Sequence, residues 1–278
     1  MFTIEITKIL PLFPNRAYVE FAVAGIETLS VPIPTLSFYV LRSEGEHPLD
    51  ESILLNPLGT TGFYYIDTTP RLLSFYSQVN YQVYTTYLGT KYFSPLTKVT
   101  RHLTRDEFLR KRKMLYDEEI VLRKFSGVKI AIVKRRHIGD RCDICFDPNT
   151  KNVTRSHCKV CYGTGFKEPY YTPFVTYSSS LPPIREVDQI GQDHGLEVNY
   201  NKYQILDYPT VNPMDIMVDL AYNERYKIDR IEQTEIRRER VHQELTVTML
   251  ARTCVEYHWD IGNNLLEIPP SISTRIEL

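Results

Sequence analysis

Two CxxC pairs lie close together near the middle of this 278-residue chain. Cys142 and Cys145 form the first pair, Cys158 and Cys161 form the second, and twelve residues separate them. A CxxC turn directs two thiolates toward one metal ion, and two such turns can complete a tetrahedral site of four sulfur ligands. The spacing therefore predicts a four-cysteine zinc knuckle over residues 137–166.

Two disulfide bonds, or thiols grouped by chance, are alternative interpretations of this spacing, and His137 or His157 could replace one thiolate. Nothing in the sequence indicates export, and four sulfurs already complete the site, so zinc with four cysteine ligands is favoured. Such a site has no open coordination position, so the predicted zinc is structural. The fifth cysteine, Cys254, is expected to be a buried, inert thiol in an apolar strand.

The composition describes an ordinary globular chain with a net charge of −1 and 42% hydrophobic residues. The N-terminal MFTIEITKILPLFP lacks the basic region and apolar core of a signal peptide, and no apolar run is long enough to span a membrane. The phosphate-binding, dinucleotide-binding, zinc-protease and serine-hydrolase motifs GxxxxGK[ST], GxGxxG, HExxH and GxSxG do not occur. The sequence therefore favours a protein that is not an enzyme.

Basic residues are concentrated in residues 101–136, which carry twelve basic and five acidic side chains. A local positive excess suggests a surface that meets an anionic partner, either nucleic acid or an acidic protein face. A solvated helix face with a few strand-end arginines is the alternative. The candidate contact residues are Arg110, Lys111, Arg112, Lys113, Lys134, Arg135 and Arg136. Residues 110–113 cannot all lie on the buried stripe of a helix, and strand alternation is expected to expose one or two of residues 134–136.

An amphipathic helix is predicted over residues 104–125. Thr104 and Glu107 have the spacing of a capping box, and Phe108, Leu115 and Leu122 recur at heptad spacing. Residues 128–133, VKIAIV, are predicted to form a strand that leads into the zinc knuckle. Together, residues 101–136 are predicted to be a basic helix and strand that link two β domains.

Residues 1–100 read as short strands separated by Pro, Gly and Asn, which predicts an antiparallel β-sandwich. The segments LSFYVLRSEG, GFYYIDT and VNYQVYTTYLGTKYFSP resemble a fibronectin type III module. In that resemblance Tyr81 and Val83 lie where the penultimate strand begins, and Ser94-Pro95 lies where the last strand starts.

The sequence after the knuckle divides into two parts. Residues 167–195 are rich in Pro, Ser and Tyr, and they are predicted to form an extended arm that is ordered only against neighbouring subunits. Residues 196–278 return to strand patterns and are predicted to form an antiparallel β domain with a C-terminal tail. Asp215 and Asp219 flank the apolar IMV, where polar strand ends are a better explanation than a catalytic pair. The predicted fold class is thus mainly β.

The stretch NPMDIMVDLAYNERYKIDRIEQTEIRRERVHQELTVTML resembles the small β-barrels of tailed-bacteriophage neck proteins, in which a D-I-hydrophobic strand precedes an R-Y-hydrophobic-I strand. The matching residues are Asp215, Ile216, Met217, Val218, Arg225, Tyr226 and Ile228, whereas Lys227 departs from the pattern. The segment around the cysteines is also similar to zinc knuckles of such virion proteins. CKVCYGTG fits one copy of the CxxCxGxG repeat of J-domain co-chaperones, but those proteins need several copies.

The resemblance implies a neck or head–tail connector subunit that assembles into a homo-oligomeric ring in the virion after synthesis in the host cytoplasm. Its expected neighbours are virion proteins on the portal or adaptor side and on the tail side, with packaged DNA as a further possible contact and no membrane. A nucleic-acid-binding zinc-ribbon protein and a baseplate or tail component are the alternatives.

Overall fold

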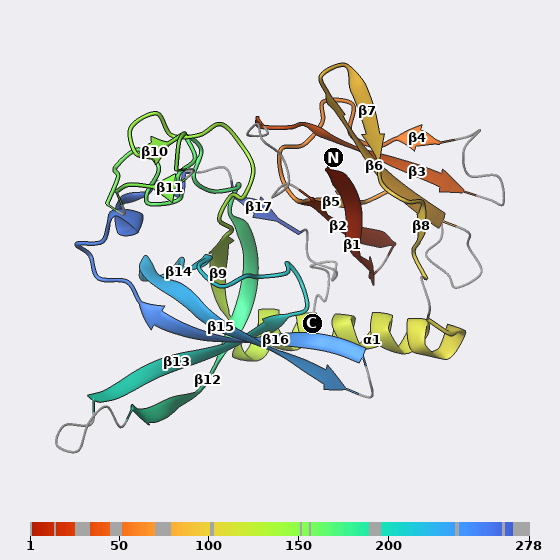
Figure 1. The fold of residues 1–278 in the computed structure, drawn as a ribbon. Helices are drawn as coiled ribbons and strands as arrows, with labels where there is room; N and C mark the ends of the chain where they lie inside the picture. The colour runs from red at the N-terminus through yellow and green to blue at the C-terminus, as the bar shows by residue number, and fades with distance from the viewer. Residues whose placement is uncertain are drawn as a thin grey trace.

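The structure, a computed structural model, describes residues 2–13, 15–25, 34–44, 52–69, 79–100, 103–150, 152–155, 157–188, 196–236, 239–262 and 265–268. For residues 182–188, 196–200, 236 and 239 it describes the backbone alone. The fold is mainly β, as predicted, with an N-terminal β-sandwich, a closed six-stranded antiparallel β-barrel, one long helix and a four-cysteine cluster. Figure 1 shows these parts with the helix α1 beneath the sandwich and beside the barrel.

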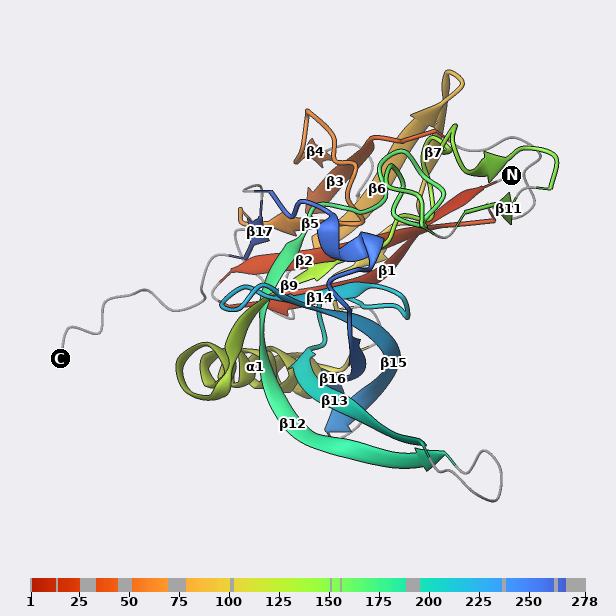
Figure 2. The same cartoon turned by 90° about the vertical axis from the view of Figure 1, so that its left-hand side faces the viewer.

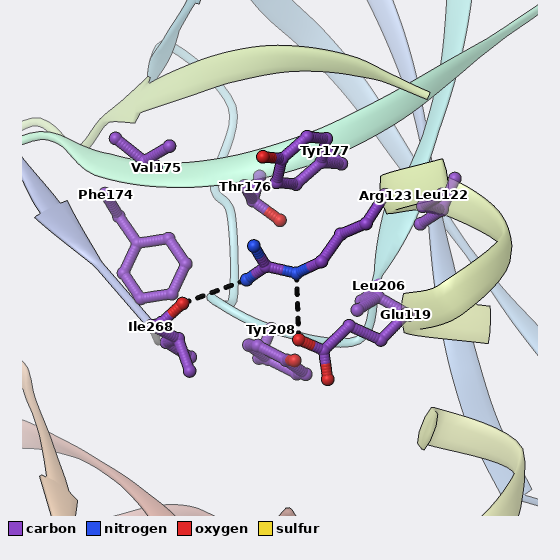
Figure 3. Close-up of a pocket in the computed structure, with 10 residues that line it drawn as sticks. All are labelled: Glu119, Leu122, Arg123, Phe174, Val175, Thr176, Tyr177, Leu206, Tyr208 and Ile268. Atoms are coloured by element: carbon purple, nitrogen blue, oxygen red, sulfur yellow. Dashed lines mark hydrogen bonds and ion pairs between the residues drawn. The ribbon is translucent and has the colours of Figure 1, made fainter. Parts of the chain in front are cut away.

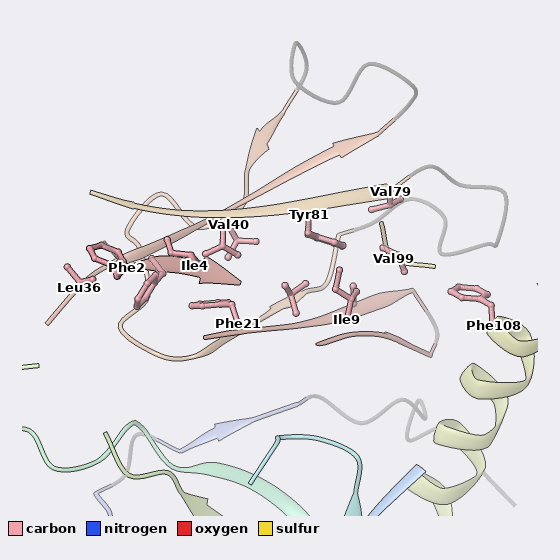
Figure 4. Packing of buried hydrophobic residues seen from close by; sticks show 14 residues of the cluster. Phe2, Ile4, Ile9, Phe21, Leu36, Val40, Val79, Tyr81, Val99 and Phe108 are labelled. Atoms are coloured by element: carbon pink, nitrogen blue, oxygen red, sulfur yellow. The ribbon is translucent and has the colours of Figure 1, made fainter. Parts of the chain in front are cut away.

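The sandwich consists of two antiparallel sheets. One sheet has the strand order β1-β2-β5, and the other has the order β4-β3-β6-β7 with β8 beside β6. The strands are β1 (Thr3–Leu12), β2 (Arg16–Ala24), β3 (Phe38–Glu44), β4 (Ile53–Leu54), β5 (Tyr64–Asp67), β6 (Val79–Tyr87), β7 (Thr90–Phe93) and β8 (Thr97–Lys98). Alternate residues of β6 point inward, because successive side chains of a strand face opposite sides. Val79, Tyr81 and Val83 thereby join the apolar core between the sheets, seen in Figure 4.

A buried polar network closes one end of this core. The Asp67 carboxylate accepts hydrogen bonds from Arg42 at 2.7 Å and from the Tyr81 hydroxyl at 2.8 Å. Thr69 donates both its backbone N–H and its hydroxyl to the other carboxylate oxygen, each at 2.9 Å. The carboxylate is therefore compensated from several directions, as a buried charge requires.

Replacing Tyr81 with Phe is expected to destabilise the protein by about 1 kcal/mol, since Asp67 keeps its other donors. Chemical denaturation of the variant and the wild type measures this difference. A loss several times larger would mean that the hydroxyl is essential to the network, contrary to its position as one donor among several.

The barrel is formed by six strands in the order β13-β16-β15-β14-β9-β12, and pairing between β12 and β13 closes it. These strands are β9 (Val128–Val133), β12 (Phe174–Asp188), β13 (Leu196–Leu206), β14 (Ile216–Asp219), β15 (Glu224–Ile236) and β16 (Glu239–Met249). The two-residue strand β17 (Leu266–Glu267) adds to β12 in parallel. Ile132, Met217 and Ile228 belong to the apolar cluster that these strands form, because residues with bulky apolar side chains recur along each strand.

Two segments differ from the predicted domain boundaries. The strand over residues 128–133 forms as predicted, but it is β9 of the barrel rather than part of a linker. Residues 174–188 form β12, which pairs with both β9 and β13, so most of the predicted extended arm is a barrel strand. A Pro- and Ser-rich composition is compatible with a strand whose hydrogen bonds are supplied by two neighbours, and local composition does not reveal such neighbours. Figure 2 shows the β12–β13 hairpin extending from the barrel; residues 189–195 lie outside the described residues.

The predicted helix is α1 (Arg105–Val121), which continues as a π-helical turn, η2 (Leu122–Ser126). The capping box of Thr104 and Glu107 is present, and Phe108, Leu115 and Leu122 are buried, so the predicted cap and apolar stripe are confirmed. Phe108 contributes to the sandwich core, where Figure 4 shows it beside Val99.

Sandwich, helix and barrel share one apolar cluster. It includes Leu12 and Tyr18 of the sandwich, Leu115 of the helix, and Phe174 and Leu206 of the barrel. Within this junction, shown in Figure 3, Arg123 forms an ion pair with Glu119 at 2.9 Å and donates to the backbone carbonyl of Ile268 at 2.9 Å. The described parts are therefore packed together rather than joined only by a linker.

Candidate metal centre

The four cysteines that the sequence predicts as metal ligands form one cluster. Cys142, Cys145, Cys158 and Cys161 are all buried, and their sulfur atoms lie within 4.8 Å of one another. Among the described residues this is the only group of Cys, His, Asp or Glu side chains with an arrangement that can hold a metal ion. His137 and His157 are exposed and stand outside the group.

The sulfur–sulfur distances fit metal ligation better than disulfide bonding. Cys142 Sγ lies 3.9 Å from Cys158 Sγ, and Cys145 Sγ lies 3.0 Å from Cys161 Sγ. Ligands about 2.3 Å from a tetrahedral zinc ion are about 3.8 Å apart, whereas disulfide-bonded sulfurs are about 2.05 Å apart. The first distance already suits a tetrahedral edge, and the second requires a small opening. All four thiols are free, so the residues present fit a metal ion.

The electrostatics of the cluster also favour a cation. Burial raises the pKa of the Cys145 and Cys161 thiols, because a thiolate is poorly solvated there. A hydrogen bond from the backbone N–H of Cys161 lowers the pKa of Cys158 to about 7. Four buried thiolates cannot be ionised together without a compensating positive charge, and a divalent metal ion supplies that charge.

Backbone turns hold each CxxC pair in place. The Phe146 N–H donates to the Cys142 carbonyl at 3.1 Å, and the Tyr162 N–H donates to the Cys158 carbonyl at 2.8 Å, so both pairs have equivalent turns. Thr154 and Thr164 donate their hydroxyls to the Cys145 and Cys161 carbonyls at 2.9 and 2.7 Å. The hairpin of β10 (Phe146–Asp147) and β11 (Asn152–Val153) joins the pairs.

Gly165 is required where the second turn ends. Its φ is +81°, and an added Cβ would lie 2.6 Å from Val153 Cγ2. Both features exclude a larger side chain without local movement. The predicted positive-φ geometry after the second pair is therefore present at Gly165, and Gly163 has a φ of +77°.

The knuckle is fixed to the barrel by basic side chains. Arg135 donates to the Gly163 carbonyl at 2.9 Å, and Arg136 pairs with Glu168 at 2.6 Å while stacking over Tyr171. The Arg141 guanidinium lies between the rings of Phe146 and Phe166, at 4.7 and 4.2 Å from their centroids. Arg135 and Arg136 thus connect the end of β9 to the second CxxC turn and to the segment that follows the knuckle, whereas the Arg141 contacts lie within the knuckle.

The predicted basic surface separates into two environments. On α1, Arg110, Lys111 and Arg112 are half-buried and Lys113 is exposed. Lys134 and Arg136 are buried, at 8% and 7% exposure, and Arg135 is half-buried. Burial removes Lys134 and Arg136 from the exposed surface that the sequence predicts, because β9 ends inside the junction of sandwich, barrel and knuckle.

Asp215, which the sequence indicates as a polar strand end, is a buried carboxylate with a structural role. Its carboxylate is fully buried and accepts backbone hydrogen bonds from Arg135 and Asn212, both at 2.8 Å. Burial raises the pKa of Asp215 to about 6. The carboxylate therefore ties the end of β9 to the start of β14 (Ile216–Asp219), while Asp219 caps the turn that follows this strand.

This burial predicts a pH-dependent contribution to stability. Because the folded pKa exceeds the unfolded value of about 3.9, the folded state binds the proton more tightly, and the contribution is largest below pH 4. It is lost as pH rises through about 6, by an amount on the order of 2–3 kcal/mol. Asp215→Asn should abolish this term, so the difference in unfolding free energy between wild type and variant should fall between pH 4 and pH 6.5. A constant difference over that range would contradict the raised pKa, and subtracting the two proteins removes the pH dependence of metal binding that they share.

Cys254 differs from its prediction. Strand β16 ends at Met249, and Cys254 is half-buried and precedes the short 3-10 helix η3 (Val255–His258). The apolar pattern of TVTML does not continue through Ala251 and Arg252, so the strand ends earlier than expected. No helix among the described residues is long and apolar enough to cross a membrane.

Comparisons with protein-family models and with curated proteins found no match to this chain.

Proposed function

We propose that this chain is a structural virion protein, a neck or head–tail connector subunit of a tailed bacteriophage that assembles into a homo-oligomeric ring, and that its four cysteines hold zinc. The observation that carries the proposal is the position of the segment that resembles phage neck proteins. Asp215 immediately precedes β14, Ile216–Val218 lie in β14, and Arg225, Tyr226 and Ile228 lie on its neighbour β15 in the closed barrel. The resemblance therefore falls on a continuous piece of the barrel.

The closed cysteine site agrees with a structural rather than an enzymatic role. Four sulfurs complete a tetrahedral zinc site and leave no position for substrate or water. When bound, the metal ion would supply the cross-link that joins the two CxxC turns. Arg135 and Arg136 would then transmit that rigidity to the barrel through the contacts described above. A rigid projection of this kind suits a subunit that must present fixed surfaces to neighbours in a virion.

Contact with packaged DNA, if the ring surrounds it, is assigned to α1. Lys113 is exposed and Arg110 and Lys111 are half-buried there, whereas Lys134 and Arg136 are buried. Lys113→Glu is expected to weaken salt-sensitive DNA binding because fewer counterions are released. Binding measured over a salt series should show a shallower slope for the variant. An unchanged slope would remove α1 from the proposed DNA surface.

Mass photometry and negative-stain imaging of the zinc-loaded protein test the assembly itself. A discrete ring with a fixed number of copies is expected, since a head-to-tail interface whose rotation closes generates a ring. Single copies at every concentration, with the metal retained, would contradict a self-assembling ring. A monomer that binds DNA strongly would instead support the nucleic-acid-binding alternative.

A further inference from the structure

A cavity of about 230 Å³ lies where the sandwich meets the barrel and the segment leading to the knuckle. Its walls come from the sandwich on one side, through β1, β2, Phe38 and residues 62–63. The other side consists of Lys134, His137, Ile138, Tyr171, Thr210 and Asn212. We refer to it as the seam cavity. Drug-sized ligands occupy pockets of about 300–1,000 Å³, so this cavity suits a smaller molecule.

Two opposite charges are buried in its wall. Glu20 is 3% exposed and Lys134 is 8% exposed, and both line the cavity. Thr210 separates them: its N–H donates to Glu20 Oε2 at 3.2 Å, and its carbonyl accepts from Lys134 Nζ at 2.7 Å. The backbone N–H of Thr210 thus binds the carboxylate, and its carbonyl binds the ammonium. Among the described contacts there is no direct ion pair between Glu20 and Lys134.

Both groups retain hydrogen-bonding capacity. The hydrogen bonds that Glu20 accepts from described residues, from Thr210 and from the Tyr18 hydroxyl at 3.1 Å, both reach Oε2, which leaves Oε1 as an acceptor. Lys134 has three donors, and its described hydrogen bond is to Thr210, while its Nζ lies 4.4 Å from the centre of the Phe63 ring. A buried ammonium and a buried carboxylate are costly unless their remaining capacity is satisfied.

Much of the rest of the wall is apolar, although Thr7, His137 and Asn212 also line the cavity. Phe21, Phe38 and Phe63 line the cavity together with Val23 and Ile138. An apolar cavity with a few convergent polar groups is the usual form of a small-molecule site. The complementary ligand carries a positive group for Glu20, a negative group for Lys134 and an apolar portion for the aromatic wall.

We propose that the seam cavity binds a small zwitterion of the α-amino-acid class with an apolar side chain. Its ammonium donates to Glu20 Oε1, its carboxylate accepts from Lys134 Nζ, and its side chain packs against the phenylalanines. Because the walls belong to both β domains, the bound molecule would strengthen the junction between them.

The test uses L-leucine and two matched analogues with the full-length, metal-loaded protein. 3-Methylbutan-1-amine lacks the carboxylate, and 4-methylpentanoate lacks the amine. L-Leucine is expected to bind and to raise the melting temperature, and each analogue is expected to bind about tenfold more weakly because one charged hydrogen bond is lost. Equal binding of all three compounds would overturn the proposal. So would the absence of L-leucine binding at about 10 mM, which is ten times a Kd of about 1 mM.

Two substitutions assign the roles. Lys134→Met is expected to reduce the preference for L-leucine over 3-methylbutan-1-amine, which lacks the carboxylate. Glu20→Gln is expected to reduce the preference for L-leucine over 4-methylpentanoate, which lacks the amine. Lys98→Met, which alters an exposed lysine of β8 that does not line the cavity, is the matched control and should leave both preferences unchanged. If either cavity variant fails to fold, the comparison of the three compounds on the wild-type protein still decides the proposal.

Discussion

Cys161→Ser is expected to lose the bound metal ion and to unfold the knuckle over residues 137–166. Cys161 is fully buried and its sulfur lies nearest to that of Cys145, so a serine hydroxyl would leave a poor fourth ligand inside a sulfur site. Structural zinc contributes an apparent binding free energy of about 10–16 kcal/mol in small zinc peptides, a quantity that includes folding of the site. This is the largest single effect that we expect from one substitution in the chain.

Elemental analysis and limited proteolysis measure the result. The wild type should contain one zinc per chain and resist cleavage within the knuckle, and the variant should contain less metal and be cleaved there. Cys254→Ser is the matched control, because Cys254 lies outside the cluster and should leave the metal content unchanged. The assignment would be contradicted if gently purified wild-type protein contained no zinc, or if its knuckle contained disulfide bonds. Zinc loss in the control would mean that the ligand set is wrong.

The cysteine cluster was predictable from sequence because its information is local. Two CxxC turns specify both the ligand type and the direction of each pair, and a short connection brings the pairs together. The helix was predictable for the same reason: Thr104 and Glu107 fix its start, and Phe108, Leu115 and Leu122 mark its buried stripe. In each case nearby residues supply the interactions that determine the element.

The closure of the barrel depended on distant contacts. β9 and β12 are paired although residues 134–173, including the whole knuckle, lie between them, and β12 also closes against β13. The composition of residues 174–188 indicates no more than extended backbone, because the partners that make it a strand come from elsewhere in the chain. The prediction of an arm was therefore correct about extension and wrong about its environment.

The burial of the basic residues was hidden for a related reason. Charged residues at a strand end are usually solvated, and KRR following VKIAIV carries no signal of burial. In the structure this strand end is surrounded by three parts of the protein. Thr210 and Phe63 contact Lys134, and Glu168 and Tyr170 contact Arg136, so each cation has partners that sequence proximity does not reveal.

Reversing the charge of Lys134 is consequently expected to be strongly destabilising, unlike the same change on α1. Lys134→Glu removes the hydrogen bond to Thr210 and the contact with Phe63, and it places a carboxylate in a wall that already holds Glu20. An uncompensated buried charge costs about 3–5 kcal/mol. Lys113→Glu changes an exposed residue and should stay within about 0.5 kcal/mol of the wild type. Thermal and chemical unfolding of the two variants, with equal metal content, measure the contrast between them. If both variants unfold like the wild type, Lys134 is solvated and the junction between sandwich and barrel is open in solution; if both are destabilised alike, charge rather than burial sets the effect.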